Sequence, residues 1–160
     1  MSRRDPIGVL DSGVGGPSIL REIRAALPGE DLIYVADSRH APYGERSEAF
    51  IVSRVTTILE YLMAERVKAA VVACNTATGV AIDDIRARFP IPIVAIEPAL
   101  KPAAAMTRSG RVGVLATHRT LESGKFARLR ETHGGGVEVF IQPGPGLAGQ
   151  VERGAFGGAG

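Results

Sequence analysis

Six short apolar runs, separated by longer segments of helical periodicity, constrain the fold of this 160-residue chain more than any other feature. Each run has the length of a buried strand and gives way to polar or glycine-rich residues. Parallel strands need a crossover long enough to hold a helix, so this alternation indicates a parallel sheet. We therefore expect an α/β fold with a parallel sheet flanked by helices. The expected strands are 7–10, 32–36, 69–73, 93–96, 111–116 and 137–141.

The clearest helical periodicity runs from Ser47 to Val67. Apolar residues recur there at spacings of three and four, which is typical of a helix with one buried face. Ser47 precedes the first apolar residue and suits the N-cap position. We interpret the apolar stripe as core packing and not as a binding surface.

Prolines between residues 90 and 102 separate the first four expected strands from the last two, as is common at a boundary. We predict an N-terminal α/β lobe over residues 1–97, carrying Asp11 and Cys74, and the beginning of a second α/β lobe over residues 98–160. Glycine is dense near the end of the chain, and the sixth βα unit has barely started. We expect this second lobe to be truncated; a flexible tail on a complete domain is the alternative.

Composition and charge argue against several classes of protein. The formal net charge is +2, and the basic residues do not cluster, so we expect no nucleic-acid partner. No apolar run approaches the ~20 residues that cross a bilayer, and the start lacks a signal-peptide pattern, so we expect no membrane partner. A single cysteine cannot form an internal disulfide and fits a reducing compartment. We therefore expect a cytoplasmic protein.

Three polar motifs follow expected strands, at the sheet edge where parallel α/β proteins bind ligands. In the first, DSGVGGP, Asp11 and Ser12 end a strand, and the glycines that follow let the backbone approach a ligand. Pro17 suits the first turn of the next helix. The glycine spacing does not match the dinucleotide fingerprint, and no Walker lysine follows, so we expect no nucleotide.

The second motif, ADSRHAPYGERS, contains a turn at Pro42, Tyr43 and Gly44. Backbone amides in such a turn can hold a carboxylate, and the basic residues beside it add positive potential. A plain turn with a solvated basic rim is the alternative.

The third motif, AVVACNTATG, holds the only cysteine. Cys74 ends a strand just before a helix, where the helix dipole favours a thiolate. Inert packing of a buried cysteine is the alternative, but the polar residues Asn75 and Thr76 favour a reactive thiol. We predict a pKa of Cys74 below that of an ordinary thiol, and only modestly so because the Asp11 carboxylate opposes the shift.

Together, VLDSGVGG, DSRHAPYGER, VVACNTATG, IEPALKPA and GVLATHRTLESGKF resemble the glutamate racemase family, in order and separation. The match runs from about Ile7 to about Gly154. It implies an aspartate/glutamate racemase-like two-lobe architecture with an incomplete second lobe. It also implies cofactor-independent interconversion of L- and D-glutamate. This reaction supplies D-glutamate for peptidoglycan synthesis, and so for cell wall biogenesis and cell shape.

The resemblance also implies roles for residues. In that family, two cysteines face opposite sides of the substrate α-carbon, one removing a proton and the other delivering one. Cys74 matches the first cysteine, and Asp11 matches the acid that assists it. Glu152 matches an auxiliary carboxylate near the second cysteine. The residues that match substrate-binding positions are Ser12, Tyr43, Gly44, Asn75, Thr76 and Thr117.

The second cysteine of the family lies in a Cys-Thr-His motif past the end of these 160 residues, which hold one cysteine only. We therefore expect impaired racemisation. One alternative is a non-catalytic member that acts by protein contacts, as some glutamate racemases are reported to do with DNA gyrase. Another is a one-thiol relative such as a decarboxylase.

No cofactor is expected. Pyridoxal phosphate needs a Schiff-base lysine and a phosphate cup, and Lys68, Lys101 and Lys125 adjoin no glycine-rich phosphate loop. We assign no metal ligands. The expected partner is glutamate, and a homo-oligomer is left open.

Overall fold

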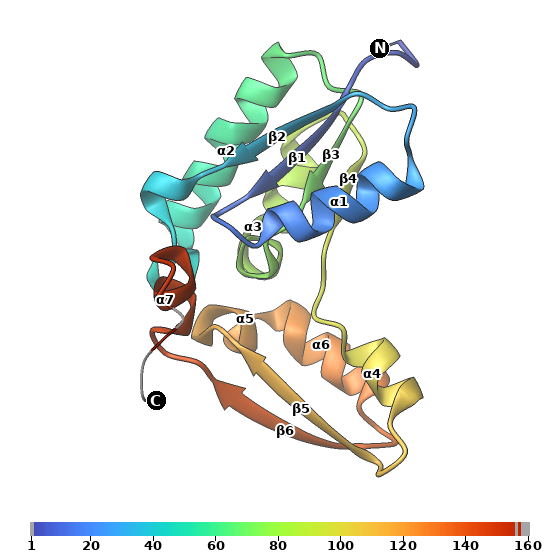
Figure 1. Cartoon of the computed structure of the whole chain (residues 1–160), viewed down its shortest axis with the longest axis vertical. Coiled ribbons are helices and arrows are strands. Elements are labelled where there is room, and N and C mark those ends of the chain that lie inside the picture. The colour runs from blue at the N-terminus through green and yellow to red at the C-terminus, as the bar shows by residue number, and fades with distance from the viewer. Residues whose placement is uncertain (1, 156, 158–160) are drawn as a thin grey trace.

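Two parallel sheets with helices between and around them make up the computed structural model, which describes residues 2–155 and 157 (Figure 1). Helices and strands alternate along the chain, and all pairings are parallel. The expected α/β fold is confirmed. Each expected strand is present, with ends that differ from the prediction by at most two residues.

The first sheet has the order β2-β1-β3-β4. Its strands are β1 (Ile7–Asp11), β2 (Leu32–Ala36), β3 (Ala69–Val72) and β4 (Ile93–Ala95). β1 and β3 lie at the centre, and their apolar side chains are buried on both faces, as in sheets covered by helices on each side.

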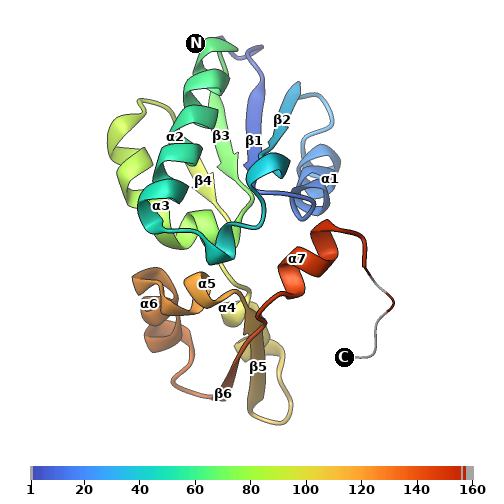
Figure 2. The ribbon, with the colours of Figure 1, turned by 90° about the vertical axis from the view of Figure 1, so that its left-hand side faces the viewer.

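Helices cover both faces of this sheet (Figure 2). On one face, α1 (Gly16–Ala26) packs against Val9 and Val71. On the other, α2 (Glu48–Ala64) and α3 (Asn75–Arg88) form the main core with Leu10. The predicted cap of α2 is confirmed, because the Ser47 side chain accepts a hydrogen bond from the Phe50 amide at 3.3 Å.

The second sheet pairs β5 (Arg111–Ala116) with β6 (Glu138–Pro143). Three helices lie on one face of it: α4 (Leu100–Met106), α5 (His118–Glu122) and α6 (Gly124–His133) (Figure 1). Val112, on the covered face, is buried, whereas Leu115 and Phe140 on the other face are 63% and 52% exposed. Among the described residues, helices therefore cover the second sheet on one side only.

Three short elements lie close to the carboxyl edge of the first sheet. Two 3-10 turns, η1 (Ser38–His40) and η2 (Tyr43–Glu45), follow β2, and α7 (Leu147–Glu152) follows β6 and returns toward the first sheet (Figure 2). Within the described residues, no helix is both long and apolar enough to span a bilayer.

Candidate active site

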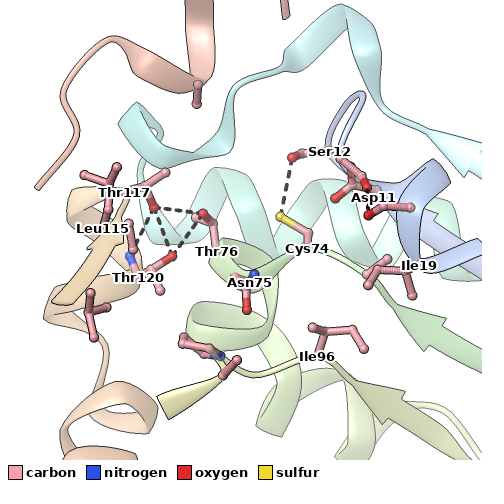
Figure 3. Close-up of a pocket in the computed structure, with 18 of the residues that line it drawn as sticks. Asp11, Ser12, Ile19, Cys74, Asn75, Thr76, Ile96, Leu115, Thr117 and Thr120 are labelled. Carbon is pink, nitrogen blue, oxygen red and sulfur yellow. Dashed lines mark hydrogen bonds between the residues drawn. The ribbon is translucent and has the colours of Figure 1, made fainter. Parts of the chain in front are cut away.

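A cavity of about 660 Å³ lies where the carboxyl ends of the first sheet face the second sheet (Figure 3). Because the carboxyl ends of parallel strands share one edge, residues distant in sequence meet there. β1 contributes Asp11 and leads to Ser12, and the end of β3 leads to Cys74. The wall opposite includes residues of β5, α5 and α7. The polar residues that line the cavity are Asp11, Ser12, Ser18, Cys74, Asn75, Thr76, Thr117, Thr120 and Glu152.

Cys74 lies at the N-terminus of α3, as predicted. Its side chain is the N-cap, and Sγ accepts a hydrogen bond from the Ala77 amide at 3.4 Å. The Ser12 hydroxyl lies 3.4 Å from the same sulfur and points toward it (Figure 3). The residue is 6% exposed.

The predicted low pKa of this thiol is wrong. Burial raises the pKa of Cys74, and the negative charge of Asp11 raises it further. Hydrogen bonds from Ser12 and Ala77 act in the opposite direction but do not prevail. The desolvation of the buried thiolate and the charge of Asp11 together outweigh these hydrogen bonds, so the thiol is protonated at neutral pH in these surroundings.

Asp11 shapes the loop that follows β1. Its Oδ2 accepts hydrogen bonds from the backbone amides of Gly13 at 3.1 Å and Gly16 at 2.8 Å. The Tyr34 hydroxyl donates to the Gly13 carbonyl at 3.0 Å and holds the loop from the other side. A Cβ on Gly16 would lie 2.4 Å from the Tyr34 hydroxyl, so the close approach requires glycine.

The hydroxyl of Tyr34 stays protonated beside the carboxylate of Asp11. Burial raises its pKa to about 12, with a further contribution from the charge of Asp11. A protonated hydroxyl remains a donor to the loop throughout the neutral range.

Three threonine hydroxyls, one from α3 and two from the wall opposite it, form a triangle (Figure 3). Thr76, on α3, lies 3.0 Å from Thr117 and 3.3 Å from Thr120, and the last two are 2.9 Å apart. Thr117 is also the N-cap of α5. The triangle joins the first sheet's helix α3 to the second sheet's helix α5 at the cavity.

Thr120 was missed by the sequence reasoning. Its signal was the T-x-x-T spacing in THRT, because a cap residue and the third residue after it lie together at a helix start.

Glu152 reaches the cavity from α7. Its Oε1 accepts a hydrogen bond from the Val14 amide at 3.1 Å, so α7 contacts the loop after β1. A Cβ on Gly13 would lie 1.9 Å from this oxygen. The structure therefore brings Glu152 to the same cavity as Asp11 and Cys74.

Tyr43 and Gly44 are placed differently from the other candidates. Neither is among the described residues that line the cavity. The Tyr43 side chain is buried, and its hydroxyl donates to Asp37 at 2.5 Å. Gly44 packs against Thr117, since a Cβ on Gly44 would lie 2.7 Å from the Cβ of Thr117. The turn therefore supports the cavity wall from behind.

The arrangement suits acid–base chemistry on a small polar molecule. A thiol and a carboxylate meet at one wall, and hydroxyl and amide donors lie at the others. Apolar residues, among them Ile19, Ile96 and Leu100, complete the lining. Low-dielectric walls strengthen hydrogen bonds from fixed donors to a developing negative charge.

Among known proteins, one family model matches most of the chain. The model, described as Asp/Glu/Hydantoin racemase, covers residues 7–151. A glutamate racemase of Pseudomonas paraeruginosa is 56% identical over 155 residues, which are 96% of this chain and 58% of the relative. One of Ectopseudomonas mendocina is 58% identical over 152 residues, 94% of this chain and 58% of the relative. The chain thus spans little more than half the length of these relatives.

Solved structures of glutamate racemases also match this chain. Escherichia coli glutamate racemase, in complex with L-glutamate and the activator UDP-MurNAc-ala, matches with a TM-score of 0.82 and 40% identity. The match covers 89% of this chain and 54% of that one. The enzyme of Francisella tularensis, in complex with D-glutamate, matches with a TM-score of 0.80 and 31% identity, covering 98% of this chain and 59% of that one.

Proposed function

Because this chain belongs to the Asp/Glu/hydantoin racemase family, among the glutamate racemases, we propose that its cavity binds glutamate and that Cys74 exchanges the α-proton. Glutamate racemases are isomerases that act on amino acids. The observation that carries the proposal is the position of the Cys74 thiol, at the head of α3 and against Ser12 in a cavity that Asp11 also lines. Similar solved structures hold L- or D-glutamate, which supports glutamate as the ligand.

The raised pKa of Cys74 requires the substrate to take part in activating the thiol. Burial and the charge of Asp11 keep the thiol protonated in the unliganded site. A glutamate ammonium group bound beside these residues would supply the opposite charge and lower the pKa of the thiol. The base is then generated only when substrate is present.

We propose the following proton transfers. The Cys74 thiol gives its proton to the Asp11 carboxylate, and the resulting thiolate takes the proton from the glutamate α-carbon. The electron pair left on the α-carbon is delocalised into the substrate's α-carboxylate. Donors from Asn75 and Thr76 stabilise that charge, as preorganised hydrogen bonds do for other carbanionic transition states.

The 160 residues contain one cysteine, so this chain offers one thiol to the substrate. With a single thiol, the abstracted proton on Cys74 first exchanges with a proton of the solvent, and the thiol then returns a solvent-derived proton to the face of the α-carbon from which the first one left. We therefore propose exchange of the α-proton with solvent, with racemisation strongly impaired. Glu152, which lines the cavity, stays a proposed auxiliary carboxylate.

A second candidate function is binding without catalysis. The raised pKa of Cys74 favours it, because a thiol that is never activated is an inert buried side chain. Such a protein would act through contacts with partners.

We also propose the division into lobes 1–97 and 98–160. The first sheet ends at Ala95, and the second begins at Arg111. A reducing, cytoplasmic setting is proposed from the single unpaired thiol.

Glutamate binding is tested by calorimetric titration of the purified chain with L- and D-glutamate. Thr76→Val, which keeps the shape and removes one hydroxyl, should raise the Kd about tenfold, since a hydrogen bond to a charged group is lost. Arg21→Gln, on the exposed side of α1, is the control and should leave the Kd unchanged. Equal affinity of the wild type and Thr76→Val, or no heat with either enantiomer, would contradict glutamate binding at this cavity.

A further inference from the structure

A second cluster of buried polar groups lies outside the cavity, at the end of β2. Asp37 directly follows this strand and is 8% exposed. Side chains from two segments surround its carboxylate. His40 and Tyr43 come from the loop after β2, and Arg54 comes from the middle of α2.

The carboxylate of Asp37 meets four donor atoms. Oδ2 accepts from the Tyr43 hydroxyl at 2.5 Å and from Arg54 Nε at 2.9 Å. Oδ1 accepts from Arg54 Nη2 at 3.1 Å and lies 2.8 Å from His40 Nδ1. The Arg54 contact is bidentate, which fixes the direction of both groups. Residues 37–43 are thereby tied to α2.

The charge balance of the cluster is stable at neutral pH. Burial by itself would raise the pKa of Asp37, but hydrogen bonds from Arg54, Tyr43 and His40 more than offset it and lower the pKa to about 2. The pair with Arg54 is therefore ionised in all conditions near neutrality.

The other side of the same loop faces α5. Gly44 packs against Thr117, and the Arg46 carbonyl accepts a hydrogen bond from Arg119 Nε at 3.0 Å. Thr117 in turn lies 3.0 Å from Thr76 and lines the cavity. A continuous set of contacts thus leads from Asp37, through the loop, to the cavity wall.

We propose that Asp37 and Arg54 are positioning residues, which hold the loop over residues 41–46 so that it seats α5 and sets Thr117 at the cavity wall. Neither residue lines the cavity or would touch the substrate. Their effect reaches the site through Tyr43, Gly44 and Thr117. The inference rests on the proposed function only in treating Thr117 as part of a glutamate site.

If Asp37 and Arg54 acted only locally, they would stabilise the loop over residues 41–46 and leave α5 unaffected. The two roles differ in what happens at residues 117–121, which Asp37 does not contact. Hydrogen exchange, followed by mass spectrometry on the full chain without ligand, measures this difference directly.

Asp37→Asn is the test variant, because it keeps the shape of the side chain and removes its charge. Glu30→Gln is the matched control, because it also removes one carboxylate of a partly buried ion pair, with Lys68, just before β2 begins. We expect exchange on the order of tenfold faster at residues 41–46 and 117–121 in Asp37→Asn. Glu30→Gln should leave both segments as in the wild type.

Arg54→Lys is a second variant, in case Asp37→Asn does not fold. Lysine keeps the charge on α2 but cannot make the bidentate contact, so the same two segments should exchange faster, to a smaller extent. Adding Arg54→Met to Asp37→Asn should change the exchange rates little further, since both substitutions disrupt the same interaction between Asp37 and Arg54. Faster exchange confined to the loop, or equal in Glu30→Gln, would overturn the proposal.

A glutamate titration of the same variants separates this inference from the proposed function. We expect the Kd to rise about tenfold in Asp37→Asn and to stay unchanged in Glu30→Gln. If the wild type does not bind glutamate, the proposed function fails, while the exchange at residues 117–121 still decides the positioning role. If the wild type binds and Asp37→Asn binds equally well, the positioning role fails and the proposed function stands.

Discussion

The first sheet and the second sheet contribute to the same cavity from very different surroundings. Around the first, helices cover both faces, and central residues such as Val9 and Val72 are fully buried. Around the second, helices cover one face, and Leu115 and Phe140 remain more than half exposed on the other. The first sheet leads to Cys74 and holds Asp11, whereas the second leads to Thr117 and Thr120.

This difference separates two tasks within one site. The thiol and the carboxylate belong to a closely packed framework, where small displacements are resisted. The threonines of α5 are held in place through contacts with that framework, among them the threonine triangle and the loop at Gly44. The thiol and the carboxylate, which we propose to transfer protons, are therefore built into the core, and part of the proposed binding wall is docked onto that core.

The largest expected effect on stability lies in the first core. Leu59, on α2, is fully buried, so Leu59→Ala should lower the free energy of unfolding by about 2–5 kcal/mol. Leu115→Ala, on the open face of the second sheet, should change it by no more than about 0.5 kcal/mol. Urea denaturation followed by circular dichroism measures both. Equal losses in the free energy of unfolding would mean that the open face of the second sheet is covered in solution. The two sheets would then not differ in burial as described.

The open face of the second sheet should promote association between copies. Within the described residues, β6 pairs only with β5, and Phe140 and Leu115 project from an exposed apolar face. Such edges and faces favour association. Phe140→Lys should reduce the associated fraction in sedimentation velocity at matched concentration.

Leu27→Lys is the control for this effect, because Leu27 is also exposed but lies beside the first sheet, at the end of α1. It should leave the associated fraction as in the wild type. A wild-type chain that sediments as a single monomeric species would contradict the expected association.

Local sequence was sufficient to predict the strands and the place of Cys74. Periodicity of apolar residues marks strands and helices over a few residues, and the change from apolar to polar after Cys74 lies two residues beyond the end of β3 at Val72. The cap at Ser47 follows from the same local chemistry.

What the sequence did not predict depends on contacts between distant residues. The pKa of Cys74 is raised by burial and by Asp11, which lies on another strand. Asp37 matters because Arg54 reaches it from α2, and Tyr43 points to Asp37 instead of the cavity. Tertiary desolvation and pairing of this kind leave no periodic signal in the chain.

The central claim is that Cys74 transfers the α-proton of glutamate, and deuterium incorporation tests it most directly. The purified chain is incubated with L- or D-glutamate in deuterated water, and the α-proton signal is followed by NMR. We expect slow incorporation into one enantiomer only, little inversion, and no incorporation with Cys74→Ser. At low glutamate the rate should rise with pH above neutrality, because burial and the charge of Asp11 raise the pKa of Cys74. Equal incorporation by the wild type and Cys74→Ser, or none by the wild type while glutamate is bound, would contradict the claim.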